Sequence, residues 1–187
     1  MIKIGVIGRA RRAGEELPAA LLESAEQVGA AIATSGAALI SGGTGGVMEA
    51  SCKGARAAGG LTIGFLPHAD PEHANPYLDL VFATGLGTVR NVLTARCSDA
   101  VIVVGGGVGT LNEMTLAYDY AVPIVALAGT GGWADRIRDV LVDGYLDERR
   151  VVPITFASSA EEAVAVALER AVGSGSGRTQ LIGWAGQ

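Results

Sequence analysis

The chain has 187 residues, of which 49% are hydrophobic and 18% charged, and its formal net charge at pH 7 is −5. This length suits one domain with a sizeable core, and the acidic balance disfavours nucleic acid as a partner, because such surfaces usually carry a basic stripe. No apolar run approaches the roughly 20 residues that span a bilayer, so we expect no membrane association and a cytoplasmic location. The two cysteines, Cys52 and Cys97, match no zinc-ligand spacing, and we expect no metal site.

Short apolar runs alternate with longer segments of helical periodicity, a pattern that predicts parallel βαβ units. The runs predict strands at residues 2–7, 37–40, 61–66, 78–83, 100–104, 123–128 and 151–156. Helices are predicted from Pro18 to Gly36, over 46–58, 88–97 and 109–120, from Trp133, and over 160–172. The expected fold is therefore α/β: a doubly wound, mainly parallel sheet (a modified Rossmann fold) with helices on both faces. Residues 1–172 would form this single domain, and the Gly/Ser-rich residues 173–187 a flexible C-terminal tail.

Two of the strand-to-helix loops are unusually rich in glycine. They run from Ser41 to Glu49 and from Gly105 to Glu113, and both follow parallel strands, so they share the sheet edge where ligands bind. Glycine lets backbone N–H groups approach phosphate oxygens, and a helix N-terminus adds favourable partial charge. The predicted phosphate- or nucleotide-binding residues are Gly42, Gly43, Thr44, Gly45, Gly46, Gly105, Gly106, Gly107, Gly109 and Thr110.

A purely structural role for these two loops stays open, because tight turns and close packing also require glycine. Neither loop continues into Gly-Lys-Ser/Thr, so neither is a Walker A motif. No GxGxxG follows the first strand, which disfavours an ordinary NAD site.

Arg90 and Glu113 are the candidate catalytic residues. Arg90 is expected in the first turn of a helix that starts at the ligand edge, and its planar fork suits phosphate or carboxylate. Glu113 lies about one turn into the helix opened by the second glycine loop. It could simply complement the helix dipole, or it could act as a general base or stabilise positive charge developing on a sugar.

The second loop and its flanks resemble the signature of the LONELY GUY family, an Arg–Lys pair followed by Pro-Gly-Gly-x-Gly-Thr-x-x-Glu. Here Arg90-Asn91 is followed by Gly106-Gly107-Val108-Gly109-Thr110 and by Glu113, which comes 23 positions after Arg90. The first glycine loop, with Met48 and the later Gly59-Gly60, is similar to the family's other glycine motif. The resemblance extends over roughly residues 1–172.

The resemblance implies a phosphoribohydrolase that cleaves nucleoside 5′-monophosphates into a free base and ribose 5-phosphate. It implies that Arg90 and Glu113 are the catalytic pair, that Gly106, Gly107, Gly109 and Thr110 hold the phosphate, and that hydrolysis requires no cofactor. Members of this family are usually homodimers, so the resemblance implies a homodimer or homotetramer.

Several positions depart from the signature. Asn91 replaces the lysine, Gly105 replaces the proline, and the first loop reads Gly8-Arg9-Ala10 where the family has a Gly-Ser-Ser type. Gly8, Arg9, Met48 and Asn91 are therefore kept as further ligand-edge candidates. The stretch from residue 83 to 91 is more similar to a neighbouring branch that contains molybdenum cofactor carrier proteins. A carrier would hold molybdopterin, a phosphorylated pterin, or another nucleotide-like ligand without turnover, and this alternative stays open beside hydrolysis.

Overall fold

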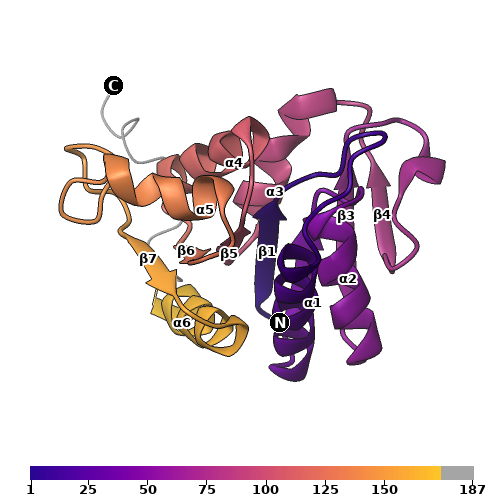
Figure 1. The fold of residues 1–187 in the computed structure, drawn as a ribbon, viewed down its shortest axis with the longest axis horizontal. Helices are drawn as coiled ribbons and strands as arrows, with labels where there is room; N and C mark the ends of the chain where they lie inside the picture. Colours follow the sequence, from indigo (N-terminus) through magenta and orange to yellow (C-terminus); the bar gives the residue numbers. More distant parts are fainter. Residues whose placement is uncertain (174–187) are drawn as a thin grey trace.

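The computed structural model describes residues 1–173, and these build one seven-stranded sheet with helices on both sides (Figure 1). The strand order is β4-β3-β2-β1-β5-β6-β7, and every neighbouring pair is parallel. The strands are β1 (Lys3–Gly8), β2 (Ala38–Ser41), β3 (Thr62–Leu66), β4 (Leu80–Ala83), β5 (Ala100–Val104), β6 (Ile124–Leu127) and β7 (Ile154–Ala157). The predicted doubly wound α/β fold is confirmed. The tail predicted at 173–187 lies outside the described residues, except for Gly173, which ends the last helix.

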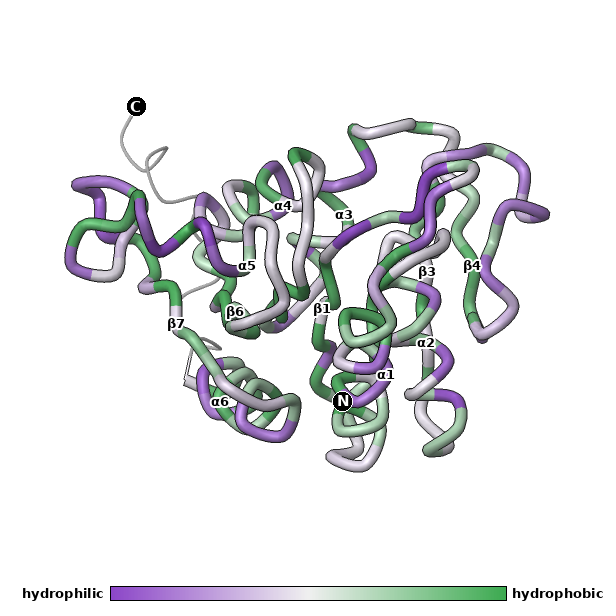
Figure 2. The backbone as a smooth tube through the Cα atoms, in the orientation of Figure 1, coloured by the Kyte–Doolittle hydropathy of each residue, from purple (hydrophilic) through white to green (hydrophobic). Residues whose placement is uncertain are grey.

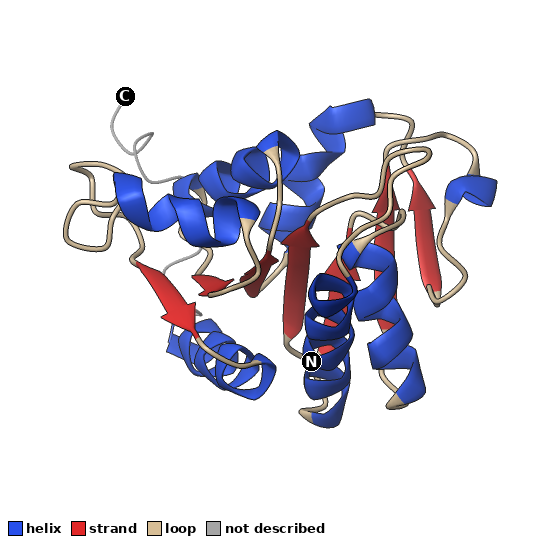
Figure 3. Cartoon of the chain, in the orientation of Figure 1, coloured by secondary structure: helices blue, strands red, loops and turns tan. Residues whose placement is uncertain are grey.

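The helices form two layers (Figure 3). On one face lie α1 (Ala19–Thr34), α2 (Val47–Ala57) and α6 (Ala160–Gly173), which share one buried cluster. On the other lie α3 (Asn91–Cys97), α4 (Val108–Asp119) and α5 (Gly132–Arg136), which pack on a second cluster. None of the described helices is both long and apolar enough to cross a membrane.

The central strand β5 supplies side chains to both clusters. Val101 and Val103 point into the α3/α4/α5 cluster, whereas Ile102 and Val104 point into the α1/α2/α6 cluster. All five β5 residues are buried, and the strand segments are correspondingly hydrophobic in Figure 2. A strand covered on both faces reads as a continuous apolar run, which is why the sequence located β5 without error.

Helices α1 and α2 approach each other through glycine. A β-carbon at Gly29 would overlap the carbonyl oxygen of Ser51, and one at Gly54 would overlap the carbonyl oxygen of Glu26. These two glycines let the helix backbones meet directly.

Two strands begin two or more residues later than the sequence predicts. The run at 151–156 starts pairing only at Ile154, because Pro153 has no N–H to give to the ladder. The run at 78–83 starts at Leu80, because the Asp79 carboxylate accepts the backbone N–H of Thr62 at 2.9 Å.

Two predicted helices are shorter than expected. The helix predicted over 88–97 begins as a 3₁₀ turn, η2 (Gly87–Arg90), before α3 starts. The helix predicted from Trp133 is the short α5, followed by a second 3₁₀ turn, η3 (Ile137–Val140).

Candidate functional site

The strand order reverses between β1 and β5, and this switch point is where an open α/β sheet leaves a crevice for ligands. The loops that follow β1, β2, β5 and β6 meet there, above the carboxyl ends of the strands (Figure 1). The second glycine loop leaves β5 at the centre of this edge and leads directly into α4.

The N-terminus of α4 is open. Its first residues, Val108, Gly109 and Thr110, carry N–H groups that cannot bond within the helix. The N-cap residue is Gly107, and no side-chain hydrogen bond within residues 1–173 caps this end of the helix. Gly107, Val108 and Gly109 are exposed, with Val108 at 79%. Free N–H groups at a helix N-terminus are typical of anion sites, and phosphate binding by this loop stays a prediction.

Thr110 also joins this loop to the first strand. Its hydroxyl donates to the carbonyl oxygen of Gly8 at 2.9 Å, and the residue is buried. The hydroxyl proton is therefore committed to Gly8, which leaves the Thr110 backbone N–H as the group that can face a phosphate. Gly8 itself packs against Val104 and Val47, and a β-carbon there would overlap the Val104 carbonyl.

The structure brings Arg90 and Glu113 into contact. Arg90 ends η2 and Glu113 lies in α4, and their side chains pair through Nη1 and Oε1 at 3.1 Å. Both are buried, with 8% and 7% of the residue exposed. Burial raises the pKa of Glu113 to about 7, although the charge and hydrogen bond of Arg90 act in the opposite direction. Both protonation states of this carboxyl are thus accessible near neutral pH.

Arg90 is further held by its neighbours. Its Nη1 also donates to Asn91 Oδ1 at 2.9 Å, and Asn91 Nδ2 donates to Asn112 Oδ1 at 2.9 Å. The buried Nε of Arg90 has no hydrogen-bond partner among residues 1–173. The guanidinium lies where a β-carbon of Gly42 would be, so glycine at this position makes room for it.

Several residues of the first glycine loop pack closely against neighbouring segments. Gly43 and Gly46 adopt φ of 77° and 81°, and β-carbons there would overlap Leu66 and the backbone of residues 9–11 respectively. The Thr44 hydroxyl lies 3.6 Å from Met48 Sδ, and Met48 is itself buried. A phosphate-binding role for Gly42 to Gly46 stays a prediction.

Asn75 is a residue that the sequence did not single out. Its Nδ2 donates to the carbonyl oxygens of Gly43 and Thr44 at 3.2 and 3.3 Å, and it is buried. It fixes the first glycine loop from a segment more than 30 positions away, and no local pattern marks such a contact.

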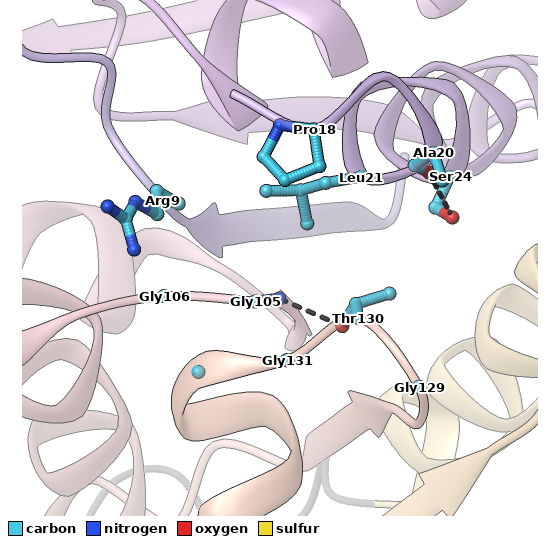
Figure 4. A pocket seen from close by; sticks show the side chains of 11 residues that line it. Arg9, Pro18, Ala20, Leu21, Ser24, Gly105, Gly106, Gly129, Thr130 and Gly131 are labelled. Carbon is cyan, nitrogen blue, oxygen red and sulfur yellow. Dashed lines mark hydrogen bonds between the residues drawn. The ribbon is translucent and has the colours of Figure 1, made fainter. Parts of the chain in front are cut away.

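A cavity of about 400 Å³ lies beside the second glycine loop (Figure 4). Gly105 and Gly106 form part of its wall, and Leu21 of α1 and the preceding Pro18 face them. Among residues 1–173, Arg9 is the only charged side chain that lines the cavity. Arg9 forms an ion pair with Glu15. Neither Arg90 nor Glu113 lines this cavity. The ion pair and the cavity are therefore two separate features beside the second glycine loop.

The far wall of the cavity is a third glycine-rich loop, Gly129-Thr130-Gly131-Gly132, which the sequence analysis missed. Thr130 Oγ1 accepts the Gly105 N–H at 2.9 Å, and the Asp135 carboxylate accepts the N–H groups of Gly129 and Gly131, both at 2.7 Å. Three glycines directly after an apolar strand run were the available signal. Among residues 1–173, no three His, Cys, Asp or Glu side chains gather as a metal ligand set.

Together these features define a Rossmann-like α/β protein with an open glycine loop and a buried Arg–Glu pair at its switch point. The chain belongs to the SLOG cluster4 family, whose sequence profile matches residues 1–164. This confirms the LONELY GUY-like resemblance of the two glycine loops.

The relatives carry two kinds of name. The chain is 38% identical over 144 residues to the cytokinin riboside 5′-monophosphate phosphoribohydrolase of Mycobacterium tuberculosis, covering 72% of this chain and 76% of that protein. The molybdenum cofactor binding protein of Rippkaea orientalis superposes with a TM-score of 0.76 at 33% identity, covering 90% of this chain and 96% of the other. The molybdenum cofactor carrier protein of Chlamydomonas reinhardtii gives a TM-score of 0.76 at 32% identity, with 92% and 99% covered.

Proposed function

We propose that the chain hydrolyses the N-glycosidic bond of a nucleoside 5′-monophosphate. The observation that carries this proposal is the buried ion pair of Arg90 and Glu113 next to the open N-terminus of α4. A protein that only held phosphate would gain little from a buried carboxylate near it, because the two negative charges repel. A carboxylate in this position is better explained by chemistry on the sugar. The phosphoribohydrolase relative from Mycobacterium tuberculosis supports the same reaction.

In this proposal the backbone N–H groups of Val108, Gly109 and Thr110 hold the 5′-phosphate, with Gly105, Gly106 and Gly107 shaping the loop. Binding there orients the ribose toward Glu113, about one and a half turns further along α4. Fixing the phosphate also lowers the entropy cost of reaching the reactive geometry.

Glu113 then acts on water and on the sugar. Its carboxylate accepts a proton from water, the water oxygen bonds to C1′, and the C1′–N bond breaks with its electron pair moving to the base. The protonated Glu113 then gives that proton to the departing base, which restores the carboxylate. The same carboxylate stabilises the positive charge that develops on the ribose. Arg90 keeps Glu113 in place and offers its remaining N–H groups to the ligand. The reaction consumes only water, so it requires no cofactor.

A second candidate function is that of a carrier for molybdopterin or another phosphorylated, nucleotide-like ligand. It is favoured by Asn91, a neutral residue directly after Arg90 where the family signature has lysine, and by the cavity that Arg9 lines next to the same glycine loop. The molybdenum cofactor carrier and binding proteins at 32–33% identity support it. A carrier would use the open N–H groups of α4 for the phosphate and release no product.

We also infer a homodimer or homotetramer. The edge strand β4 and the turn η2 expose several apolar side chains, among them Phe82 at 50% and Val89 at 67%. Phe82 stacks on Phe65 of β3 at 5.3 Å between ring centroids, and Val89 directly precedes Arg90. An apolar surface of this kind is typical of subunit contacts, and light scattering on the purified chain tests it.

The experiment that separates the two functions incubates the protein with a panel of nucleoside 5′-monophosphates and follows the free base by chromatography. Glu113→Gln and Arg90→Ala should abolish base release, while Glu169→Gln, an exposed site on α6, should retain it. Unchanged release by Glu113→Gln would contradict the mechanism. No release from any nucleotide, together with a ligand-dependent rise in Tm, would favour the carrier.

A further inference from the structure

Arg90 has more hydrogen-bonding capacity than its site uses. Both of its protein acceptors, Asn91 Oδ1 and Glu113 Oε1, are served by the single nitrogen Nη1. Within residues 1–173, Nη2 and Nε donate to no acceptor, and Nε is buried. Buried donors without partners are costly. Nη2 is not among the buried unpartnered atoms, so within residues 1–173 it is the Arg90 donor that remains free for a ligand.

The direction of the guanidinium is set by an amide pair. Arginine only donates hydrogen bonds, so Asn91 must turn its oxygen toward Arg90 and its NH₂ group away from it. The NH₂ group meets Asn112 Oδ1 at 2.9 Å, across from α3 to α4. Chemistry alone therefore fixes both amide orientations, and only a side chain with one acceptor and one donor can replace Asn91.

This amide pair also limits how Arg90 engages Glu113. Arginine and carboxylate commonly form two parallel hydrogen bonds, yet here a single contact joins Nη1 to Oε1, and Oε2 makes no hydrogen bond within the described chain. Asn91 competes for Nη1 from the other side, and the backbone of Gly42 restricts movement of the guanidinium plane. Arg90 and Glu113 are therefore joined by one hydrogen bond and not by two.

We propose that Asn91 and Asn112 are positioning residues that hold Arg90 so that its Nη2 and the second oxygen of Glu113 stay available to the ligand. Where the family signature has a charged lysine after the arginine, this chain orients Arg90 through the hydrogen bonds of Asn91 and Asn112. For its kinetic consequence this inference rests on the proposed hydrolysis, but the orientation of Arg90 is a property of the folded chain alone.

The test uses Asn112, because it is exposed and its substitution should therefore cost little stability. Asn112→Ala removes the oxygen that accepts the hydrogen bond of Asn91 Nδ2, whereas Asn112→Asp retains an acceptor oxygen at this position. The first readout is NMR of the arginine side chains, which reports the rate of rotation about the Nε–Cζ bond. We expect rotation of Arg90 to become about tenfold faster in Asn112→Ala, a small free-energy change, and to stay close to wild type in Asn112→Asp.

The second readout is steady-state kinetics on a nucleoside 5′-monophosphate. Asn112→Ala should lower kcat about tenfold with little change in KM, and Asn112→Asp should restore it. Unchanged Arg90 rotation in Asn112→Ala, or equal acceleration in both variants, would overturn the proposal. If the wild-type chain releases no base, the proposed hydrolysis fails by itself, and the rotation measurement still decides whether the amide pair positions Arg90.

Discussion

The guanidinium of Arg90 lies directly against the backbone of Gly42, in the space that a β-carbon would fill. This contact joins the loop after β2 to the turn before α3, two segments about 50 positions apart in the sequence. It gives the first glycine loop a role in the site that does not depend on phosphate: Gly42 shapes the position of the cation.

Gly42→Ala should therefore act mainly through Arg90. Its added methyl group would push the guanidinium away from Glu113, and we expect loss of at least about 90% of base release. The cost in stability should be about 1–3 kcal/mol, measured by chemical denaturation. The double variant Gly42→Ala/Arg90→Ala has no guanidinium to displace, so the cost of the Gly42 substitution should largely disappear in that background. Additive costs would show that the contact with Arg90 is not the cause.

The raised pKa of Glu113 predicts a specific pH dependence of stability. The folded pKa is about 7 and the ordinary value is 4.5, so the native state binds more protons between these pH values. The contribution of Glu113 to the free energy of unfolding should therefore be largest below pH 4.5 and should fall as the pH rises through 7. The full effect is about 3 kcal/mol.

Glu113→Gln removes this titration. The difference in unfolding free energy between wild type and Glu113→Gln, measured by urea denaturation from pH 4.5 to pH 8, should shift in favour of the variant as the pH rises. A difference that is constant over this range would mean that Glu113 titrates near its ordinary pKa in the folded chain.

The contact between Thr110 and Gly8 predicts a linkage between α4 and β1. Thr110→Val keeps the shape but loses the donor, which removes this partner from the half-buried Gly8 carbonyl and should cost about 1–3 kcal/mol. Thr110→Ser keeps the hydroxyl and should recover most of this loss. Thermal denaturation of the three proteins measures the effect, and equal stability of the valine and wild-type chains would rule out the linkage.

The close approach of α1 and α2 predicts a stability effect away from the site. Gly29→Ala places a β-carbon onto the Ser51 carbonyl and should cost about 1–3 kcal/mol of unfolding free energy, since the backbones must separate. Gln27→Ala, an exposed position on the same helix, should stay within about 0.5 kcal/mol of wild type. A Gly29→Ala chain as stable as Gln27→Ala would show that the helices accommodate the methyl group.

The sequence was sufficient to predict the features that depend on local pattern. Buried parallel strands such as β5 appear as unbroken apolar runs, and the second glycine loop indicates the open helix that comes after it. Contacts between distant segments leave no such mark. The position of Gly42 against Arg90, the support from Asn75 and the amide pair of Asn91 and Asn112 all depend on tertiary packing, which periodicity and composition do not encode.

The open N-terminus of α4 gives the most direct test of the anion site. Val108 is the first residue of the helix and is 79% exposed. An acidic side chain there complements the helix dipole, so Val108→Asp should stabilise the fold by about 0.3–1 kcal/mol. The same carboxylate would compete with a phosphate for the free N–H groups, so binding of a nucleoside 5′-monophosphate, measured by calorimetry, should weaken at least about tenfold. Val108→Ala should leave binding close to wild type, because the side chain contributes no N–H group. Opposite signs for stability and binding are hard to obtain unless the ligand's anion sits at this helix end, and a Val108→Asp chain that binds as tightly as Val108→Ala would place the phosphate elsewhere.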